Sequence, residues 1–238
     1  NPARQCSILS GIPIEKSAIT VNQVCGSGLR AVSLAAQSIM TNQSKIVIAG
    51  GQESMSNAHH TLNIRNGLKM GDGKLKDSMI IDGLWCAMND YHMGTTAENI
   101  ADQFKITKDE QDEFAVASQS KTENAQKNSK FDKEIVTIEI ASKKETKHFK
   151  EDEFPRHGST FEKINSLKPV FKKDGTVTAG NASGLNDGSA ALILMNEKTA
   201  NELKLVPLAR IVSWATVGVD PSIMGIGPVP AVRESLKK

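Results

Sequence analysis

The sequence is poor in the residues on which disulfide-stabilised, zinc-binding and membrane-spanning proteins depend. It has three cysteines in 238 residues, Cys6, Cys25 and Cys86, an odd number without CxxC spacing, which argues against a disulfide framework or a zinc cage. No run approaches about 18 apolar residues, and no charged-then-apolar leader opens the chain. We therefore expect a soluble protein of a reducing, cytoplasmic compartment.

Aromatic residues and net charge are scarce as well. Aromatics make up 4% of the chain, and 29 basic residues against 27 acidic ones leave a net charge of +2. Proteins that bind nucleic acid or a membrane surface usually carry a strong basic excess. We expect neither partner, and any anionic ligand must be met by local charges.

The first 50 residues contain a strand, helix and strand pattern. Residues 17–22 (SAITVN) have strand composition, and residues 45–50 (KIVIAG) form a short continuous apolar run. This order predicts a β-α-β unit with buried parallel strands. Between the two strands, apolar residues recur at helical spacing at Leu29, Val32, Ala36 and Ile39.

A long insertion separates this unit from the next core strands, which we predict at residues 189–195 and 208–217. The intervening region, residues 55–184, is rich in charge and glycine. Its clearest helix covers residues 108–127, opened by a capping box of Thr107 and Glu110. Residues 134–140 (EIVTIEI) alternate like a half-exposed strand.

Cys25 stands between the first predicted strand and helix and is followed by Gly26 and Gly28. A helix N-terminus stabilises the negative charge of a thiolate, the reactive form of cysteine. The glycines permit a tight turn of the nucleophile-elbow kind, and their backbone N–H groups are candidates for an oxyanion hole. The alternative is an inert small hydrophobe, the usual state of a buried cysteine.

At this point the sequence resembles the thiolases, and specifically their short-chain acetyl-CoA acetyltransferase branch. The resemblance covers essentially the whole chain, in order. It is carried by VNQVCGSGLRAV, GGQESMS, YHMGTTAENIA, EFPRHGS, GTVTAGNASGLNDGSAA and ARIVSWATVGVDPSIMGIGPVPA. It implies condensation of two acetyl-CoA to acetoacetyl-CoA and CoA, or the reverse thiolysis, through an acyl group on Cys25.

The resemblance also implies the residues that hold coenzyme A. Arg156 matches a position near the nucleotide, His92 a histidine beside the pocket, and Ser183 a hydrogen-bonding position for pantetheine. Without the family, Arg156 and Lys172 would be interpreted as solvated charges, Met93 and Phe171 as core filling, and the glycines of GTVTAGNASG as turn formers. The remaining positions line the pantetheine tunnel: Leu84, Met93, Phe171, Ala179 and Met224.

The implied fold is a layered α/β/α thiolase core with an inserted loop domain. We expect a partial N-terminal core over residues 1–54 and 185–200, a CoA-binding loop domain over 55–184, and a truncated C-terminal core over 201–238. The family also implies a homotetramer, coenzyme A as substrate rather than as cofactor, and no metal.

The family's catalytic histidine, second cysteine and asparagine lie in GHP, CxGGG and NEAF motifs, none of which occurs in these 238 residues. We therefore expect the chain to be an incomplete piece that is inactive alone. Two alternatives stay open. One is a non-catalytic CoA-binding or assembly fragment, and the other is a β-ketoacyl synthase, against which the long insertion argues.

Overall fold

The computed structural model describes residues 1–143 and 145–237, which form two compact units. The first unit comprises Asn1–His59, Asp187–Thr216 and the chain from Pro230 on. The second comprises His60–Asn186 and Val217–Val229. The second unit thus holds most of the predicted insertion together with a short segment that we had expected in the C-terminal core. The assignment of these segments to an N-terminal core, a CoA-binding loop domain and a C-terminal core stays a prediction.

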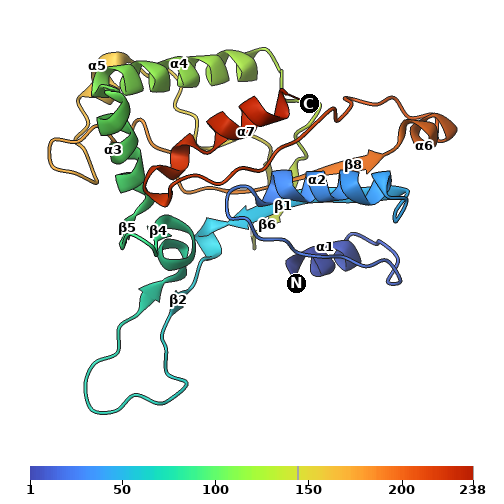
Figure 1. Ribbon diagram of the computed structural model, residues 1–238, viewed down its shortest axis with the longest axis horizontal. Coiled ribbons are helices and arrows are strands. Elements are labelled where there is room, and N and C mark those ends of the chain that lie inside the picture. Colours follow the sequence, from blue (N-terminus) through green and yellow to red (C-terminus); the bar gives the residue numbers. More distant parts are fainter. Residues whose placement is uncertain (144, 238) are drawn as a thin grey trace. The chain divides into compact units, whose positions relative to one another are not determined.

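The first unit is built on a two-stranded antiparallel sheet (Figure 1). β1 (Ile46–Ser54) pairs with β8 (Asp187–Met195) along its full length, and α2 (Ser27–Met40) packs against both strands. The other elements of this unit are α1 (Pro2–Leu9), the 3-10 helix η1 (Met55–Asn57), α6 (Glu197–Glu202) and most of α7 (Pro228–Ser235).

The predicted β-α-β unit with buried parallel strands is wrong. The partner of β1 comes from a segment more than a hundred residues later that runs in the opposite direction. Residues 17–22 and 208–217 have strand composition but form no strand, because each strand needs a neighbouring backbone to complete its hydrogen bonds. The sheet is also open, since most residues of β8 are exposed.

The core of the first unit consists of a few side chains, most of them small. Ala35 and Ile39 of α2 and Ala49 of β1 are buried. Leu29, which the helical pattern placed on the buried face, is 82% exposed. The first turn of α2 approaches β1 through Gly28 instead, since a Cβ on Gly51 would lie 3.6 Å from Gly28 Cα. The predicted helix exists; of its predicted apolar face Ile39 is buried and Val32 and Ala36 are half-buried, and Ser33 and Ala35 complete the buried side.

The second unit is organised around two helices, α3 (Met93–Phe104) and α4 (Lys108–Lys127). η3 (Pro221–Ile226) packs against α3, and α5 (Phe161–Asn165) packs against α4. Three short antiparallel pairs complete it: β2 (His60–Thr61) with β3 (Lys76–Asp77), β4 (Trp85–Cys86) with β5 (Tyr91–His92), and β6 (Ile138–Ala141) with β7 (Thr146–Phe149). A five-residue π-helix, η2 (Ile80–Leu84), precedes β4.

The helix predicted at residues 108–127 is confirmed with its capping box. Thr107 Oγ1 accepts from the N–H of Glu110, and the Glu110 carboxylate accepts from the N–H of Thr107 at 2.8 Å. Of the predicted strand at 134–140, only the last part is extended, as the start of β6. Among the described residues, no helix combines the length and apolarity required to cross a membrane.

Candidate active site

Cys25 lies on a tight elbow that ends where α2 begins. Its side chain is exposed, and Gly26 is the N-cap of the helix. The elbow is fixed by hydrogen bonds among its own residues: Gln23 N to Ser27 Oγ at 2.8 Å, Ser27 Oγ to Val24 O at 2.6 Å, and Val24 N to Asn22 Oδ1 at 2.8 Å. A rigid turn therefore presents the thiol to its surroundings.

The residue before the cysteine has a strained backbone. Val24 has a φ of +47°, in the left-handed region that β-branched residues rarely adopt. Such a conformation costs about 1–3 kcal/mol and persists where the surrounding structure enforces it, often at a functional site. Val24 and Cys25 are the two central residues of a turn that the Gly26 N–H closes by donating to the carbonyl of Gln23 at 2.9 Å, so Cys25 lies at its apex.

The two expected oxyanion donors, the N–H groups of Gly26 and Gly28, differ in whether each already donates to an acceptor within the chain. The N–H of Gly26 already donates to the carbonyl of Gln23 at 2.9 Å, so its assignment as a free donor is wrong. The N–H of Gly28, in the first turn of α2, has no acceptor among the described residues. First-turn N–H groups carry the positive end of the helix dipole, so Gly28 is the donor left for a developing negative charge.

All eight predicted binding residues belong to the second unit, whereas Cys25 belongs to the first. Within the second unit, the structure brings several of them together at the start of α3. The His92 ring stacks on Phe171 with ring centroids 4.7 Å apart and an interplanar angle of 19°. Met93 follows as the first residue of α3.

His92 also caps α3. Its Nδ1 accepts a hydrogen bond from the N–H of Gly94 at 3.0 Å. In a neutral imidazole one nitrogen accepts and the other carries the proton. The capping bond therefore assigns the proton to Nε2, which leaves that N–H as the donor that His92 can offer to a ligand.

Gly94 is the reason that Phe171 can lie so close to this helix end. A Cβ at Gly94 would come within 2.3 Å of the Phe171 ring atoms Cδ2 and Cε2. Only a glycine leaves room for the ring. The stack of His92 and Phe171 thus depends on the absence of a side chain at Gly94, the last residue of the motif YHMG.

Leu84 reaches this region through the β4–β5 hairpin. It ends η2 directly before Trp85, whose strand partner is His92. The neighbouring Cys86 is 1% exposed. Burial raises the pKa of its thiol, but hydrogen bonds from the Asn89 side chain and from nearby backbone N–H groups lower the pKa more, to below its ordinary value.

Ala179 and Ser183 lie, both exposed, on the loop of residues 176–184. Two buried acidic side chains hold this loop, Glu98 of α3 and Asp112 of α4. Met224 lies in η3, which Asn99 of α3 holds by donating to the carbonyl of Ser222 at 2.9 Å. One helix therefore supports the elements that carry Met93, Ala179 and Met224.

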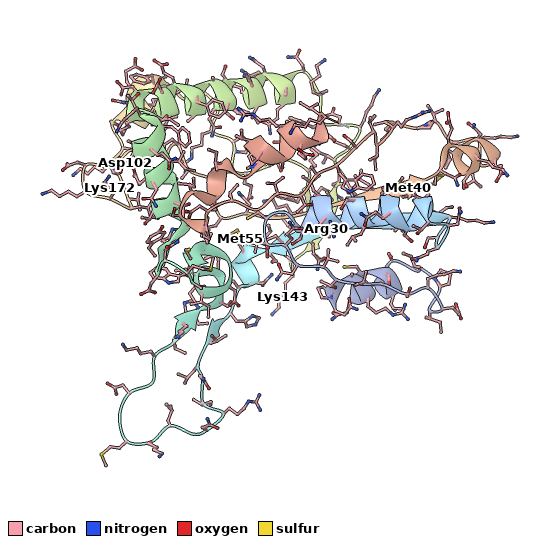
Figure 2. The ribbon with its side chains drawn as sticks, viewed as in Figure 1. Arg30, Met40, Met55, Asp102, Lys143 and Lys172 are labelled. Atoms are coloured by element: carbon pink, nitrogen blue, oxygen red, sulfur yellow. The ribbon has the colours of Figure 1, made fainter. Side chains whose placement is uncertain are left out.

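Arg156, expected near the nucleotide, and Lys172 differ in whether an acidic group already pairs with them. Lys172 is paired with Asp102 at 2.5 Å, and Figure 2 shows both side chains beside α3. The hydrogen bond to Asp102 raises the pKa of Lys172 above its ordinary value of 10.5. Arg156 is exposed, its N–H donates to Gln119 Oε1 at 2.8 Å, and its guanidinium pairs with no acidic group among the described residues. Arg156 is the cation free to meet a phosphate.

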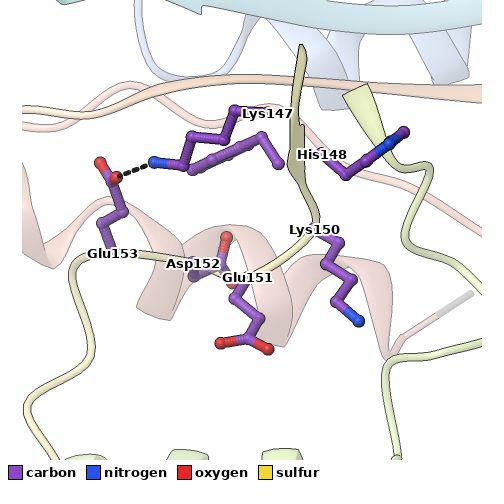
Figure 3. Close-up of a pocket in the computed structure, with 7 residues that line it drawn as sticks. Lys147, His148, Lys150, Glu151, Asp152 and Glu153 are labelled. Atoms are coloured by element: carbon purple, nitrogen blue, oxygen red, sulfur yellow. Dashed lines mark ion pairs between the residues drawn. The ribbon is translucent and has the colours of Figure 1, made fainter. Parts of the chain in front are cut away.

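A shallow hollow lies elsewhere in the second unit, beside β7. It has a volume of about 430 Å³ and is lined by residues 147–153, with Lys147 and Glu153 paired at 3.8 Å across it (Figure 3). None of the nine predicted site residues lines it. Across residues 1–143 and 145–237, no three or more His, Cys, Asp or Glu side chains gather as metal ligands would.

Sequence reasoning missed the residues that support the site. Glu98, Asn99 and Asp112 appear in the sequence as ordinary polar positions of helices, and no local signal distinguishes them. The available hint was that Glu98 lies within the motif YHMGTTAENIA, next to predicted binding residues. Their partners lie dozens of residues away along the chain.

Comparison with known proteins identifies relatives over the whole chain. Residues 1–198 match the family described as "Thiolase, N-terminal domain". An acetyl-CoA acetyltransferase of Paracoccus denitrificans is 58% identical over 238 residues, which cover 100% of this chain and 61% of the relative. A cytosolic acetyl-CoA acetyltransferase of Rattus norvegicus is 50% identical over 240 residues, covering 100% of this chain and 60% of the relative.

A solved structure agrees with these sequences. Human mitochondrial 3-ketoacyl-CoA thiolase in complex with CoA superposes with a TM-score of 0.93 at 43% identity, over 99% of this chain and 59% of the human one. The chain thus spans about three fifths of the length of the curated relatives it matches.

Proposed function

The chain belongs to the thiolase family, whose α/β fold it shares, and from this premise we propose that the protein is an acetyl-CoA acetyltransferase with Cys25 as its nucleophile. The observation that carries the proposal is the elbow: an exposed thiol at the apex of a strained turn, ahead of the first turn of α2. The names of the Paracoccus and rat relatives support the same activity.

In the first half-reaction, the Cys25 thiolate attacks the carbonyl carbon of acetyl-CoA, and the C–S bond to coenzyme A breaks as its thiolate leaves. The product is an acetyl group on Cys25. The free N–H of Gly28 is a candidate donor to the carbonyl oxygen, on which negative charge develops. One thioester replaces another, so the free-energy change of the step is close to zero and the step runs in either direction.

In the second half-reaction, the acetyl group passes to the enolate carbon of another acetyl-CoA, which gives acetoacetyl-CoA and frees Cys25. Thiolysis is the reverse, with the acetoacetyl-CoA carbon–carbon bond broken and CoA taking the acetyl group. The proton transfers are assigned to the family's histidine and second cysteine, whose motifs do not occur in these 238 residues.

Coenzyme A is proposed to bind the second unit as the substrate, with no separate cofactor or metal. The stack of His92 and Phe171 supplies an apolar wall with one N–H donor, and Ser183 supplies an exposed hydroxyl. Arg156 supplies an exposed cation for the nucleotide phosphates. The CoA complex of the human relative supports this choice of ligand. We propose a cytoplasmic location, supported by the rat relative, and a homotetramer, by family resemblance.

The test is the intact mass of the protein expressed from its complete gene, before and after incubation with acetyl-CoA, followed by peptide mapping. We expect one added acetyl group, on Cys25, and none in Cys25→Ala. Cys6→Ala is the matched control because Cys6 is also an exposed thiol. An unmodified wild-type protein would favour a non-catalytic binding role, and persistent acetylation of Cys25→Ala would refute the nucleophile assignment.

A further inference from the structure

Glu98 is a buried carboxylate that does not belong to the chemistry described above. It lies on α3, is 2% exposed, and accepts hydrogen bonds from two consecutive residues of a distant loop. The N–H of Thr176 donates to both carboxylate oxygens at 2.9 Å, its hydroxyl donates at 3.0 Å, and the N–H of Val177 donates at 2.8 Å. These hydrogen bonds tie residues 176 and 177 directly to α3.

The same loop is held from its other side by a second buried group. Asn181 Nδ2 donates to Asp112 Oδ1 at 2.8 Å and to the carbonyl of Thr176 at 2.9 Å, while its Oδ1 accepts from the N–H of Thr178 at 2.8 Å. Asp112 is fully buried on α4. Asp112 also accepts from Lys108 Nζ at 2.5 Å and from Asn165 Nδ2 at 3.1 Å. Two helices therefore hold residues 176–181, α3 through Glu98 and α4 through Asp112.

This arrangement demands close approach of the loop backbone to α3. A Cβ on Gly175 would lie 2.4 Å from Glu98 Oε1, so the loop passes the carboxylate at a distance that only glycine allows. Burying a charge is unfavourable compared with burying an apolar side chain of similar volume, and its best-supported benefit is a unique geometry. What this geometry holds in place is the loop of residues 176–184, in which Val177 and Thr178 are buried while Ala179 and Ser183 are exposed.

We propose that Glu98 is a positioning residue for coenzyme A binding, which fixes the loop of residues 176–184 so that Ser183 and Ala179 meet the pantetheine arm. The inference rests on the proposed function of this unit. It deepens that proposal by assigning part of the substrate affinity to a carboxylate that does not touch the substrate.

The test compares Glu98→Gln with wild type in the protein expressed from its complete gene. The amide retains the volume of the carboxylate but directs an NH₂ group at backbone N–H donors, so the loop loses at least one acceptor. We expect the KM for acetyl-CoA and the Kd for CoA to rise about tenfold or more. The kcat at saturation should stay within about threefold of wild type, because bound substrate still meets Cys25. Hydrogen exchange should speed up in residues 175–184.

Two further variants make the test decisive. Glu113→Gln removes the same charge from an exposed position of α4 and should leave both constants unchanged. Thr176→Val removes only the hydroxyl bond to Glu98 and should raise the KM by a smaller factor, about threefold. If Glu98→Gln does not fold, the Thr176→Val result decides the question in the same way.

An unchanged KM in Glu98→Gln, or a parallel loss of kcat and of global stability, would overturn the inference and leave the proposed function intact. A wild-type protein that binds no CoA would instead refute the proposed function, and this inference with it. A raised KM with preserved kcat and faster exchange confined to the loop would support it.

Discussion

Alanine at Gly94 should destabilise the protein although the substitution improves helix propensity. Gly94 is the second residue of α3, and alanine is favoured over glycine within helices by up to about 1 kcal/mol. In the structure, however, the new methyl group would lie 2.3 Å from two atoms of the Phe171 ring. The ring must move away, because atoms at that distance overlap.

The magnitude follows from the contacts that would be lost. Displacing the ring removes its stack with His92, a contact of about 0.5–1.5 kcal/mol, and forcing a methyl group into the remaining space adds about 1–3 kcal/mol. With a propensity gain of about 1 kcal/mol subtracted, we expect a net destabilisation of about 0.5–3.5 kcal/mol. The displaced Phe171 should also weaken CoA binding.

Gly28 provides a matched control, because it is the second residue of α2 and a Cβ there meets no atom within 4 Å. Gly28→Ala should therefore change stability by between zero and about 1 kcal/mol in the favourable direction. Urea unfolding followed by circular dichroism measures both variants. Equal shifts, or a more stable Gly94→Ala protein, would refute the reasoning from the Phe171 ring.

Three further outcomes follow from single groups. Asp112→Ala leaves its half-buried donors Lys108, Asn165 and Asn181 without their acceptor and should cost about 3 kcal/mol in urea unfolding, so a loss below about 1 kcal/mol would contradict its role. Hydrogen bonds from Ser56, first its hydroxyl and then its N–H, hold the pKa of Asp187 below its ordinary value of 3.8. The stability that this provides is complete above about pH 4 and is lost as the pH falls through the folded-state pKa, an acid dependence that Asp187→Asn should lack in unfolding titrations. Iodoacetamide should alkylate Cys25 in the folded protein but reach Cys86 only after unfolding, despite the lowered pKa of Cys86, because that thiol is 1% exposed; equal rates in peptide mapping would contradict this.

The parts of the fold that could be predicted from the sequence are those encoded by near neighbours. The helix at residues 108–127 was predicted because Thr107 and Glu110, three residues apart, satisfy each other's backbone N–H groups. α3 was not predicted, because its cap is a histidine ring nitrogen rather than one of the usual capping side chains.

The candidate site likewise has features that neighbouring residues encode and features that depend on backbone angles or distant segments. Cys25 was identified from its own segment, since the cysteine, the glycines and the start of the helix lie within four residues of one another. The strain at Val24 and the use of the Gly26 N–H could not be predicted, because both depend on backbone angles that the residue types leave open. Glu98 could not be distinguished from a solvated helical charge, because its partners lie 78 and 79 residues away.

The sequence by itself determined the chemistry on offer: a thiol before a helix, a set of motifs in thiolase order, and the helix bounded by its own capping box. Only the tertiary structure decided that β1 pairs antiparallel with β8, that Gly94 makes room for Phe171, and that Glu98 holds the loop of residues 176–184. The physical reason is that a cap or a turn is completed by residues a few positions away. A strand pair, a ring contact or a buried carboxylate is completed by whichever distant segment supplies the missing surface or hydrogen bonds.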